Sequence, residues 1–214
     1  MPGSDNLTIF FQVLTFLIVI GLAVSVHEAS HAYVANRLGD PTARLMGRMT
    51  LNPFAHIDPL GTIVVPFILL TYSLVSSGSG LVFGWAKPTP INPLNFRHPF
   101  RDSALVAFGG PVSNFLLAIL FAVIFRIIGG SIFLEIIRLN LLLGIFNLIP
   151  IPPLDGYKIV LGVLPKETAG RLMVLETYGP IFIIIFLLLF LQVFSPILSL
   201  LLNSLLSLLT GTTL

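Results

Sequence analysis

The stretch L-T-I-F-F-Q-V-L-T-F-L-I-V-I-G-L-A-V-S-V-H-E-A-S-H occupies residues 7–31. Residues 7–26 are almost wholly apolar, and a helix of about this length crosses the hydrocarbon core of a membrane. Three ionisable side chains, His27, Glu28 and His31, follow directly. Such groups at membrane depth are costly and mark functional sites by default. The stretch therefore predicts a membrane helix that carries a functional site near its end.

The pattern H-E-A-S-H predicts a metal site on that helix. Residues four apart lie on one helix face, so His27 and His31 can share one cation, and Glu28 can reach water held beside it. With zinc as the cation, the glutamate can accept a proton from that water and pass it to a leaving amine. The structural alternative is that these side chains end a helix that emerges into water, bonded to carbonyls or solvent.

Composition restricts the class of protein. The chain has 214 residues, 56% hydrophobic and 9% charged, with a mean hydropathy of +1.01. A soluble domain carries about 25% charged residues, so a water-soluble fold is excluded, and the apolar content excludes disorder. The chain has no cysteine, so any metal must be held by His, Asp or Glu. A net charge of +2 without a basic stripe excludes a nucleic-acid partner.

The expected fold is an all-α polytopic membrane protein with about five transmembrane helices. The first helix should continue until Gly39, Asp40 and Pro41 end it. It lacks the basic leader and cleavage site of a removable signal peptide. Further spans are expected over residues 103–128, 132–149, 178–194 and 196–209.

We expect one membrane-embedded domain, 1–214, with a catalytic core over about 7–165 and C-terminal helices over about 178–209. Residues 41–58 are polar and turn-rich, which predicts a short strand or hairpin near the active site. Residues 61–80 are apolar for only about 15 positions, which suits a re-entrant element better than a crossing.

Basic residues favour one orientation in the membrane. If 61–80 re-enters, nine lysines and arginines share one face, and only Arg126 and Arg138 lie toward the other. The N-terminus is then outside, and the active site faces the cytoplasm. The nine are Arg37, Arg44, Arg48, Lys87, Arg97, Arg101, Lys158, Lys166 and Arg171.

A catalytic zinc has three protein ligands and one open position, so a third ligand must come from elsewhere in the chain. The candidates are His56, Asp58, His98, Asp102 and Asp155. Asp155 differs from the others because it follows a proline break in F-N-L-I-P-I-P-P-L-D-G-Y, residues 146–157. Broken backbone at membrane depth must be buried in protein or line a wet cavity, where a ligand could enter a site. Asp155 could equally be a residue that only begins a helix.

Three motifs together resemble the site-2 protease family of intramembrane zinc metalloproteases. They are H-E-A-S-H at 27–31, G-P-V-S-N at 110–114 and N-L-I-P-I-P-P-L-D-G at 147–156. The segments at 52–62 and 83–90 are similar to those of the small prokaryotic stand-alone members. No PDZ or CBS domain is expected in this chain.

The resemblance implies a role for each motif residue. His27, His31 and Asp155 are implied as ligands of one catalytic Zn²⁺, and Glu28 as the general base. It also implies a prokaryotic inner-membrane protein and a transmembrane protein substrate, such as a membrane-tethered regulator or an anti-sigma factor.

Asn147 and Asn114 are amides in apolar spans, whose commoner use is hydrogen bonding between helices. The resemblance implies a place near the active site for Asn147, with a role in substrate or oxyanion binding. It implies that Asn114 is the polar position of a helix that packs against the site. Both are therefore expected substrate-binding residues.

The resulting hypothesis is an intramembrane protease that hydrolyses a peptide bond in or near a transmembrane segment. Its substrate must unwind, and we expect the freed backbone to pair in extended form with residues 41–58 or 81–90. The alternative is a small cation or proton transporter or channel component that uses the His/Glu cluster. A transporter would spread polar residues along several spans, whereas here they cluster at one depth.

Overall fold

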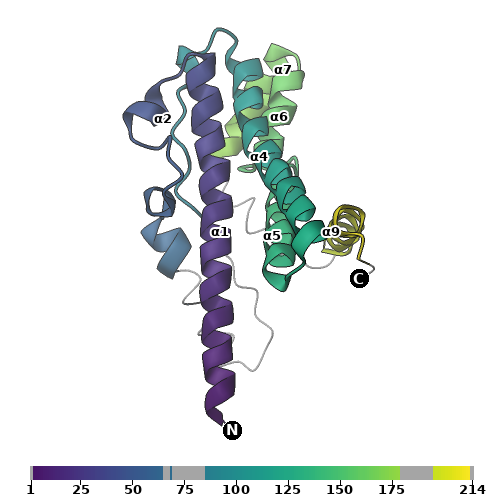
Figure 1. The fold of residues 1–214 in the computed structure, drawn as a ribbon. Helices are drawn as coiled ribbons and strands as arrows, with labels where there is room; N and C mark the ends of the chain where they lie inside the picture. The colour runs from purple at the N-terminus through teal and green to yellow at the C-terminus, as the bar shows by residue number, and fades with distance from the viewer. Residues whose placement is uncertain (1, 65–67, 69–84, 179–194, 213–214) are drawn as a thin grey trace.

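The computed structural model describes residues 2–64, 68, 85–178 and 195–212, and every regular element within them is a helix (Figure 1). The α-helices are α1 (Pro2–Leu38), α2 (Thr42–Leu45), α4 (Pro99–Ile128), α5 (Ser131–Asn147), α6 (Asp155–Val163), α7 (Lys166–Met173) and α9 (Ser195–Thr210). Short 3₁₀ or π elements are η1 (Pro53–His56), η2 (Pro59–Val64), η3 (Pro93–Asn95) and η4 (Val174–Tyr178). The all-α prediction is confirmed for this part of the chain.

Helix α1 contains all of residues 7–31 and runs beyond them at both ends. It ends at Leu38, because Gly39 adopts a φ of +112° that other residues rarely take. The N–H of the following Asp40 donates to the Ala35 carbonyl at 2.9 Å and closes the helix end. The predicted stop at residues 39–41 is confirmed.

Helices α1, α4 and α5 pack against one another, and α6 packs against α4 (Figure 1). Small residues on α4 allow α5 to approach closely, as is common between membrane helices. Helix α9 completes this core and is seen almost end-on beside α5 in Figure 1. The buried core residues are Ala118, Ala122, Ile137, Leu141, Leu202 and Leu206.

Among the described residues, two helices are long and apolar enough to cross a membrane. They are Val13–Leu38 within α1 and the whole of α4, with mean hydropathies of 1.9 and 2.2. Helix α5 matches the span expected over 132–149 but has only 17 residues. The apolar part of α9 is likewise shorter than the two long helices. The span expected over 178–194 and most of 61–80 lie outside the described residues. The five-span arrangement and the re-entrant element stay predictions.

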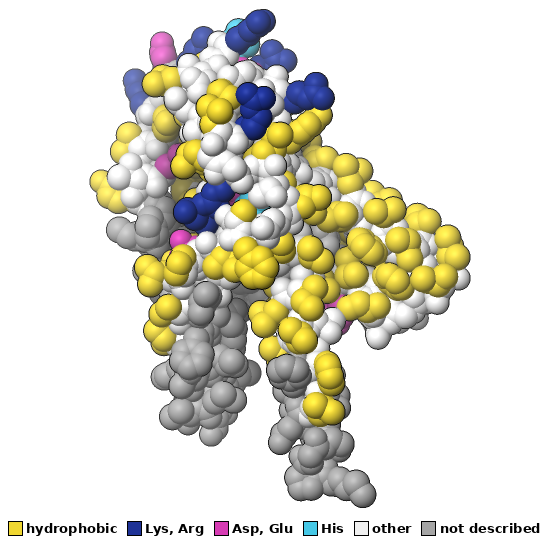
Figure 2. Space-filling view, turned by 60° about the vertical axis from the view of Figure 1, so that its left-hand side comes forward, with side chains coloured by type: hydrophobic (Ala, Val, Ile, Leu, Met, Phe, Trp, Pro, Cys, Tyr) yellow, Lys and Arg dark blue, Asp and Glu magenta, His cyan; other side chains and the backbone are white. Residues whose placement is uncertain are grey.

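The surface is divided between apolar and basic regions. In the view of Figure 2, Lys and Arg side chains gather at the end of the molecule where α1 finishes, and hydrophobic side chains cover the flank below them. Such a division suits a protein whose flank lies in lipid and whose basic end lies among headgroups and water. The side of the membrane on which that end lies stays a prediction.

The strand or hairpin expected over residues 41–58 is not what the structure contains, since this stretch forms α2 and η1. Asn52 begins η1, because its side-chain oxygen accepts a hydrogen bond from the Phe54 N–H, and Pro53 takes the first helical position. Arg48 donates to the Ala55 carbonyl and ties the stretch together. Local capping therefore outweighed the alternation of basic and apolar residues on which the strand prediction rested.

The proline break after α5 is confirmed. The chain turns through residues 148–154, where the Leu154 N–H donates to the Ile151 carbonyl at 2.9 Å. Asp155 is the first residue of α6, so it does begin a helix, as one of the two interpretations of this residue expected. Because α6 packs against α4, this turn brings Asp155 back to the helix that also packs on α1.

Candidate metal centre

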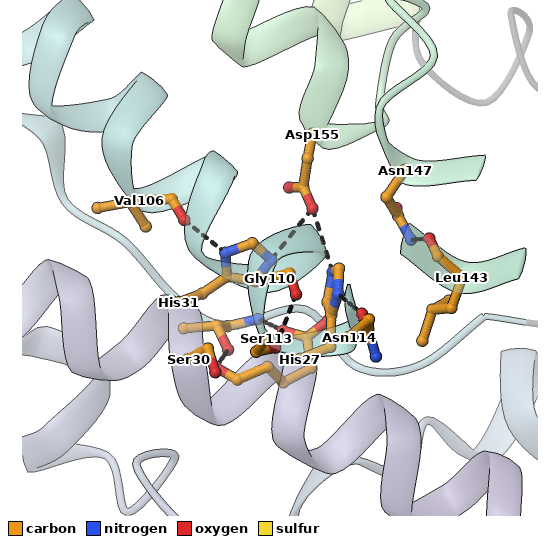
Figure 3. A network of polar contacts seen from close by, with 12 residues as sticks. His27, Ser30, His31, Val106, Gly110, Ser113, Asn114, Leu143, Asn147 and Asp155 are labelled. Atoms are coloured by element: carbon orange, nitrogen blue, oxygen red, sulfur yellow. Dashed lines mark hydrogen bonds and ion pairs between the residues drawn. The ribbon is translucent and has the colours of Figure 1, made fainter. Parts of the chain in front are cut away.

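His27 and His31 lie one helical turn apart on α1 and face the same side (Figure 3). Their ring centroids are 4.6 Å apart and the rings are perpendicular, at 89°. Both are buried, with 5% and 6% exposure. Asp155 approaches from α6, and its Oδ2 lies 3.1 Å from His27 Nε2 and 3.2 Å from His31 Nε2. Residues far apart in the chain thus meet at one point.

The outer nitrogen of each imidazole is fixed by a hydrogen bond. His31 Nδ1 lies 2.7 Å from the Val106 carbonyl, which can only accept, so this nitrogen donates its proton. His27 Nδ1 lies 2.7 Å from Asn114 Oδ1, and an amide oxygen also only accepts. In the neutral rings, both Nε2 atoms therefore present lone pairs toward Asp155. Hydrogen bonds of this kind orient histidine ligands in metal sites.

The three inner atoms fit a metal ion. Asp155 Oδ2 is buried and has no hydrogen-bond partner among the described residues, although a buried carboxylate oxygen is costly when it is left so. The three ligand atoms lie within 4.8 Å of one another. A tetrahedral zinc with bonds of about 2.0 Å has ligands roughly 3.3 Å apart, close to the two distances from Asp155 Oδ2. His27, His31 and Asp155 could therefore hold a metal ion.

Helix α4 covers the two histidines through a glycine. A Cβ atom at Gly110 would lie 2.5 Å from His31 Nε2 and 2.6 Å from His27 Cε1, closer than real Cβ contacts. Glycine is therefore required at this position for α4 to pack over the rings and bring Val106 and Asn114 to their outer nitrogens.

Glu28 lies beside the cluster and is held by Thr89. The Thr89 N–H donates to Glu28 Oε2 at 2.8 Å, and the Thr89 hydroxyl donates to the Glu28 carbonyl at 2.9 Å. Pro88 and Pro90 flank Thr89 and have no N–H, so Thr89 supplies the backbone donor of this short segment. The segment thereby fixes one oxygen of Glu28.

A pocket of about 130 Å³ opens onto these groups. Its lining combines the metal-binding cluster and Glu28 with the proline-flanked segment and the start of α6. The lining residues are His27, Glu28, His31, Pro88, Thr89, Ile91, Ala107, Asn147, Pro153, Asp155 and Lys158. The site is therefore reachable from outside the protein.

Three of the other four candidate side chains have local partners instead. His56 Nε2 lies 2.9 Å from the Thr50 carbonyl, and Asp58 Oδ1 accepts from the Gly61 N–H at 2.7 Å. Asp102 Oδ2 accepts from the His98 N–H at 2.9 Å and stabilises the start of α4. The structure brings none of these four to the histidine pair, and Asp155 is the candidate that reaches it.

The two asparagines lie on different sides of the site. Asn147 lines the pocket, and its Nδ2 donates to the Leu143 carbonyl at 2.9 Å, which leaves its oxygen for another partner. Asn114 is fully buried behind His27. Its side chain contacts His27, Ala23 and Asn140, and substrate binding by either asparagine stays a prediction.

Sequence reasoning missed Thr89 and Asn140. Thr89 carries a signal in retrospect, because the run P-T-P isolates one N–H between two prolines. Asn140 is a lone amide in an apolar helix and donates to the Ile136 carbonyl at 2.9 Å. Its oxygen accepts from Asn114 Nδ2, also at 2.9 Å, a contact that the spacing of residues along the chain does not reveal.

Known proteins resemble this chain along most of its length. YwhC of Bacillus subtilis (strain 168), provisionally named a zinc metalloprotease, is 40% identical over 184 residues, which cover 78% of each chain. Rip2 of Mycolicibacterium smegmatis, named in the same way, is 26% identical over 86% of this chain and 71% of its own. The regulator of sigma-E protease RseP of Salmonella typhimurium is 28% identical over 53% of this chain but only 25% of its own. No family model and no solved structure matches the chain.

Proposed function

The chain belongs to the site-2 protease family of membrane zinc metalloproteases, and from that membership we propose that it hydrolyses a peptide bond in or near a transmembrane segment of a membrane protein. One observation carries the proposal. Asp155 Oδ2 and the Nε2 atoms of His27 and His31 converge at an open pocket that Glu28 also lines.

We propose His27, His31 and Asp155 as the protein ligands of one zinc ion. Two imidazoles and a carboxylate form a donor set that zinc uses, and three protein ligands leave a position open for catalysis. A zinc ion bound there would lower the pKa of water to about 7 and polarise the scissile carbonyl. Val106 and Asn114 keep the two imidazoles oriented toward it.

Glu28 is the proposed general base. It lies one residue after His27, and Thr89 holds its Oε2 at the pocket. In hydrolysis its carboxylate accepts a proton from the attacking water and then transfers it to the amine that leaves the cleaved bond. The Thr89 N–H limits the rotation of the carboxylate between these two transfers.

The substrate is proposed to bind in extended form, because a helical segment keeps its carbonyls in internal hydrogen bonds. Of the two stretches expected to pair with it, residues 81–90 have the stronger support, since Pro88 and Thr89, in the described part of that stretch, line the pocket. Residues 41–58 form α2 and η1 instead of a strand. Membrane-anchored anti-sigma factors are proposed substrates because the name of RseP assigns it to sigma-E regulation. The pocket is proposed to open on the cytoplasmic side of a prokaryotic inner membrane.

The test combines zinc analysis with cleavage of a single-span reporter protein. The purified wild-type protein should hold about one zinc per chain and cleave the reporter. Glu28→Gln should keep zinc and lose cleavage, because an amide cannot accept the proton. Glu135→Gln, the same change on the exposed face of α5, should behave like wild type. A wild-type protein without zinc, or full cleavage by Glu28→Gln, would overturn the proposal.

A further inference from the structure

A chain of buried amides runs behind His27 and connects three helices. Asn114 on α4 and Asn140 on α5 are 0% and 1% exposed. Asn114 Nδ2 donates to Asn140 Oδ1 at 2.9 Å and to the Ala23 carbonyl of α1 at 3.3 Å. Asn140 Nδ2 in turn donates to the Ile136 carbonyl at 2.9 Å. The links made by Asn114 are buried and the link from Asn140 to Ile136 is partly buried, so the Asn114 amide depends on its protein partners.

The direction of these hydrogen bonds is set at the Ile136 carbonyl. A backbone carbonyl only accepts, so the Asn140 atom that faces it must be the NH₂ group. Asn140 then turns its oxygen toward Asn114. An amide oxygen also only accepts, so Asn114 must present its NH₂ group to Asn140.

The same direction continues to the imidazole. With its NH₂ group facing Asn140, Asn114 presents Oδ1 to His27 Nδ1 at 2.7 Å. His27 must then carry a proton on Nδ1. Its Nε2, the atom that lies 3.1 Å from Asp155 Oδ2, is left to bind. Asn140 thus stands at the start of the series of hydrogen bonds that places the proton of His27 on Nδ1 and leaves Nε2 without one.

We propose that Asn140 is a positioning residue that fixes the Asn114 amide and, through it, the Nδ1–H form of His27. The proposal rests on the proposed role of His27 as a metal ligand. Without the Asn140 oxygen, the longer contact with Ala23 alone orients Asn114. The amide can then turn over and place its NH₂ group against His27 Nδ1, which opposes the form that binds through Nε2. Outer partners of metal ligands commonly change metal affinity by about 10–100-fold.

Zinc affinity tests the proposal in purified full-length protein, by competition with a chelating dye. Asn140→Leu should weaken zinc binding about tenfold or more. In Asn140→Asp, the neutral carboxyl group can donate its O–H to the Ile136 carbonyl and keep its other oxygen opposite Asn114, so its affinity should stay near wild type. Ile137→Val, a core change three residues before Asn140 on α5, loosens packing without removing an amide and should also bind like wild type. Unchanged affinity in Asn140→Leu, or an equal loss in Asn140→Asp, would overturn the proposal.

A double-variant comparison separates positioning from a general loss of structure. If Asn140 acts through Asn114, then adding Asn140→Leu to Asn114→Ala should cause no further loss of zinc affinity. The same loss in both backgrounds would show that Asn140 acts independently and would overturn the proposal.

The metal-free protein gives a second readout that does not depend on zinc or on cleavage. In ¹⁵N-histidine-labelled protein, the His27 signal, assigned by its absence in His27→Gln, should show a protonated Nδ1. Asn140→Leu should reduce that protonated fraction, and Asn140→Asp should not. An unprotonated Nδ1 in the wild type overturns this inference even if zinc binds. If the wild-type protein binds no zinc but its His27 Nδ1 is protonated, the proposed function is overturned and this inference is not.

Discussion

Thr89 contacts Glu28 through its backbone N–H and its hydroxyl, and the hydroxyl can be removed alone or together with the N–H. Thr89→Pro deletes the N–H that holds the carboxylate, and a hydrogen bond to a charged group contributes about 1.5–3 kcal/mol. We therefore expect cleavage to fall about 10–100-fold while zinc content stays at the wild-type level. Thr89→Val keeps the N–H and should lose only a few-fold, as measured in the reporter assay. Equal activity in the two variants would contradict a role for the N–H.

Gly110 is the second residue whose identity the site demands. Gly110→Ala would drive a Cβ into the His31 and His27 rings, so at least one ring must move. We expect at least a tenfold loss of zinc affinity in the chelator assay. Gly170→Ala is the control, since a Cβ there meets nothing within 4 Å, and it should bind zinc normally. Wild-type affinity in Gly110→Ala would show that the helices can separate without disturbing the ligands.

At the scale of elements, Asp40 joins the end of α1 to the segment that leads into α4. Its carboxylate is fully buried and accepts hydrogen bonds from the Asn92 N–H and from Asn95 Nδ2, both at 2.7 Å, as well as from Thr42. Burial alone would raise the pKa of Asp40, but these hydrogen bonds outweigh it and hold that pKa below its ordinary value. The contacts anchor residues 92–95, just beyond the segment that holds Glu28.

The lowered pKa gives a stability that depends on pH. The unfolded chain has the higher pKa, about 3.9, so the stabilisation is fully present above that pH and is lost as pH falls through the lower folded-state value. We expect Asp40→Asn to lower the thermal unfolding midpoint at pH 7 and to flatten the decline of stability below pH 4. Thermal unfolding measured across pH 3–7 checks both effects. If the stability of Asp40→Asn falls below pH 4 as steeply as that of the wild type, other carboxyl groups cause the decline.

At the scale of the whole molecule, Arg126 attaches α9 to the core. It lies near the end of α4, where its Nε and Nη2 atoms donate to the Leu209 and Leu208 carbonyls at 2.7 and 2.8 Å. These carbonyls belong to the last turn of α9, whose partial negative charge favours a cation.

We expect Arg126→Met, which keeps the length of the side chain but not its donors, to lower the thermal midpoint by several degrees. Zinc affinity should not change, because the metal centre lies on α1 and α6. Thermal unfolding and chelator competition on the same sample measure the two effects. A loss of zinc affinity of the kind expected for Gly110→Ala would show that α9 supports the site.

The length of the apolar runs and the Gly and Pro residues that end them were sufficient to predict the long helices, because both signals act locally in the chain. They placed α1, α4 and the break before Asp155 close to where they lie. The strand over residues 41–58 was not found, because Asn52 and Pro53 favour a helical turn more strongly than the residue alternation favours a strand. The sequence alone predicted His27 and His31 as a pair of ligands because they are four residues apart on one helix.

The sequence by itself determined the membrane class of the protein, its principal helices and the pair of histidines, since each depends on residues within a few turns of one another. Only the tertiary structure brought Asp155 beside both histidines, placed Thr89 on Glu28 across 61 positions of sequence, and joined His27 to Asn114 across 87 positions. A hydrogen bond between distant residues depends on how helices pack and which atoms remain unpaired when they do. Those conditions exist only in the folded chain.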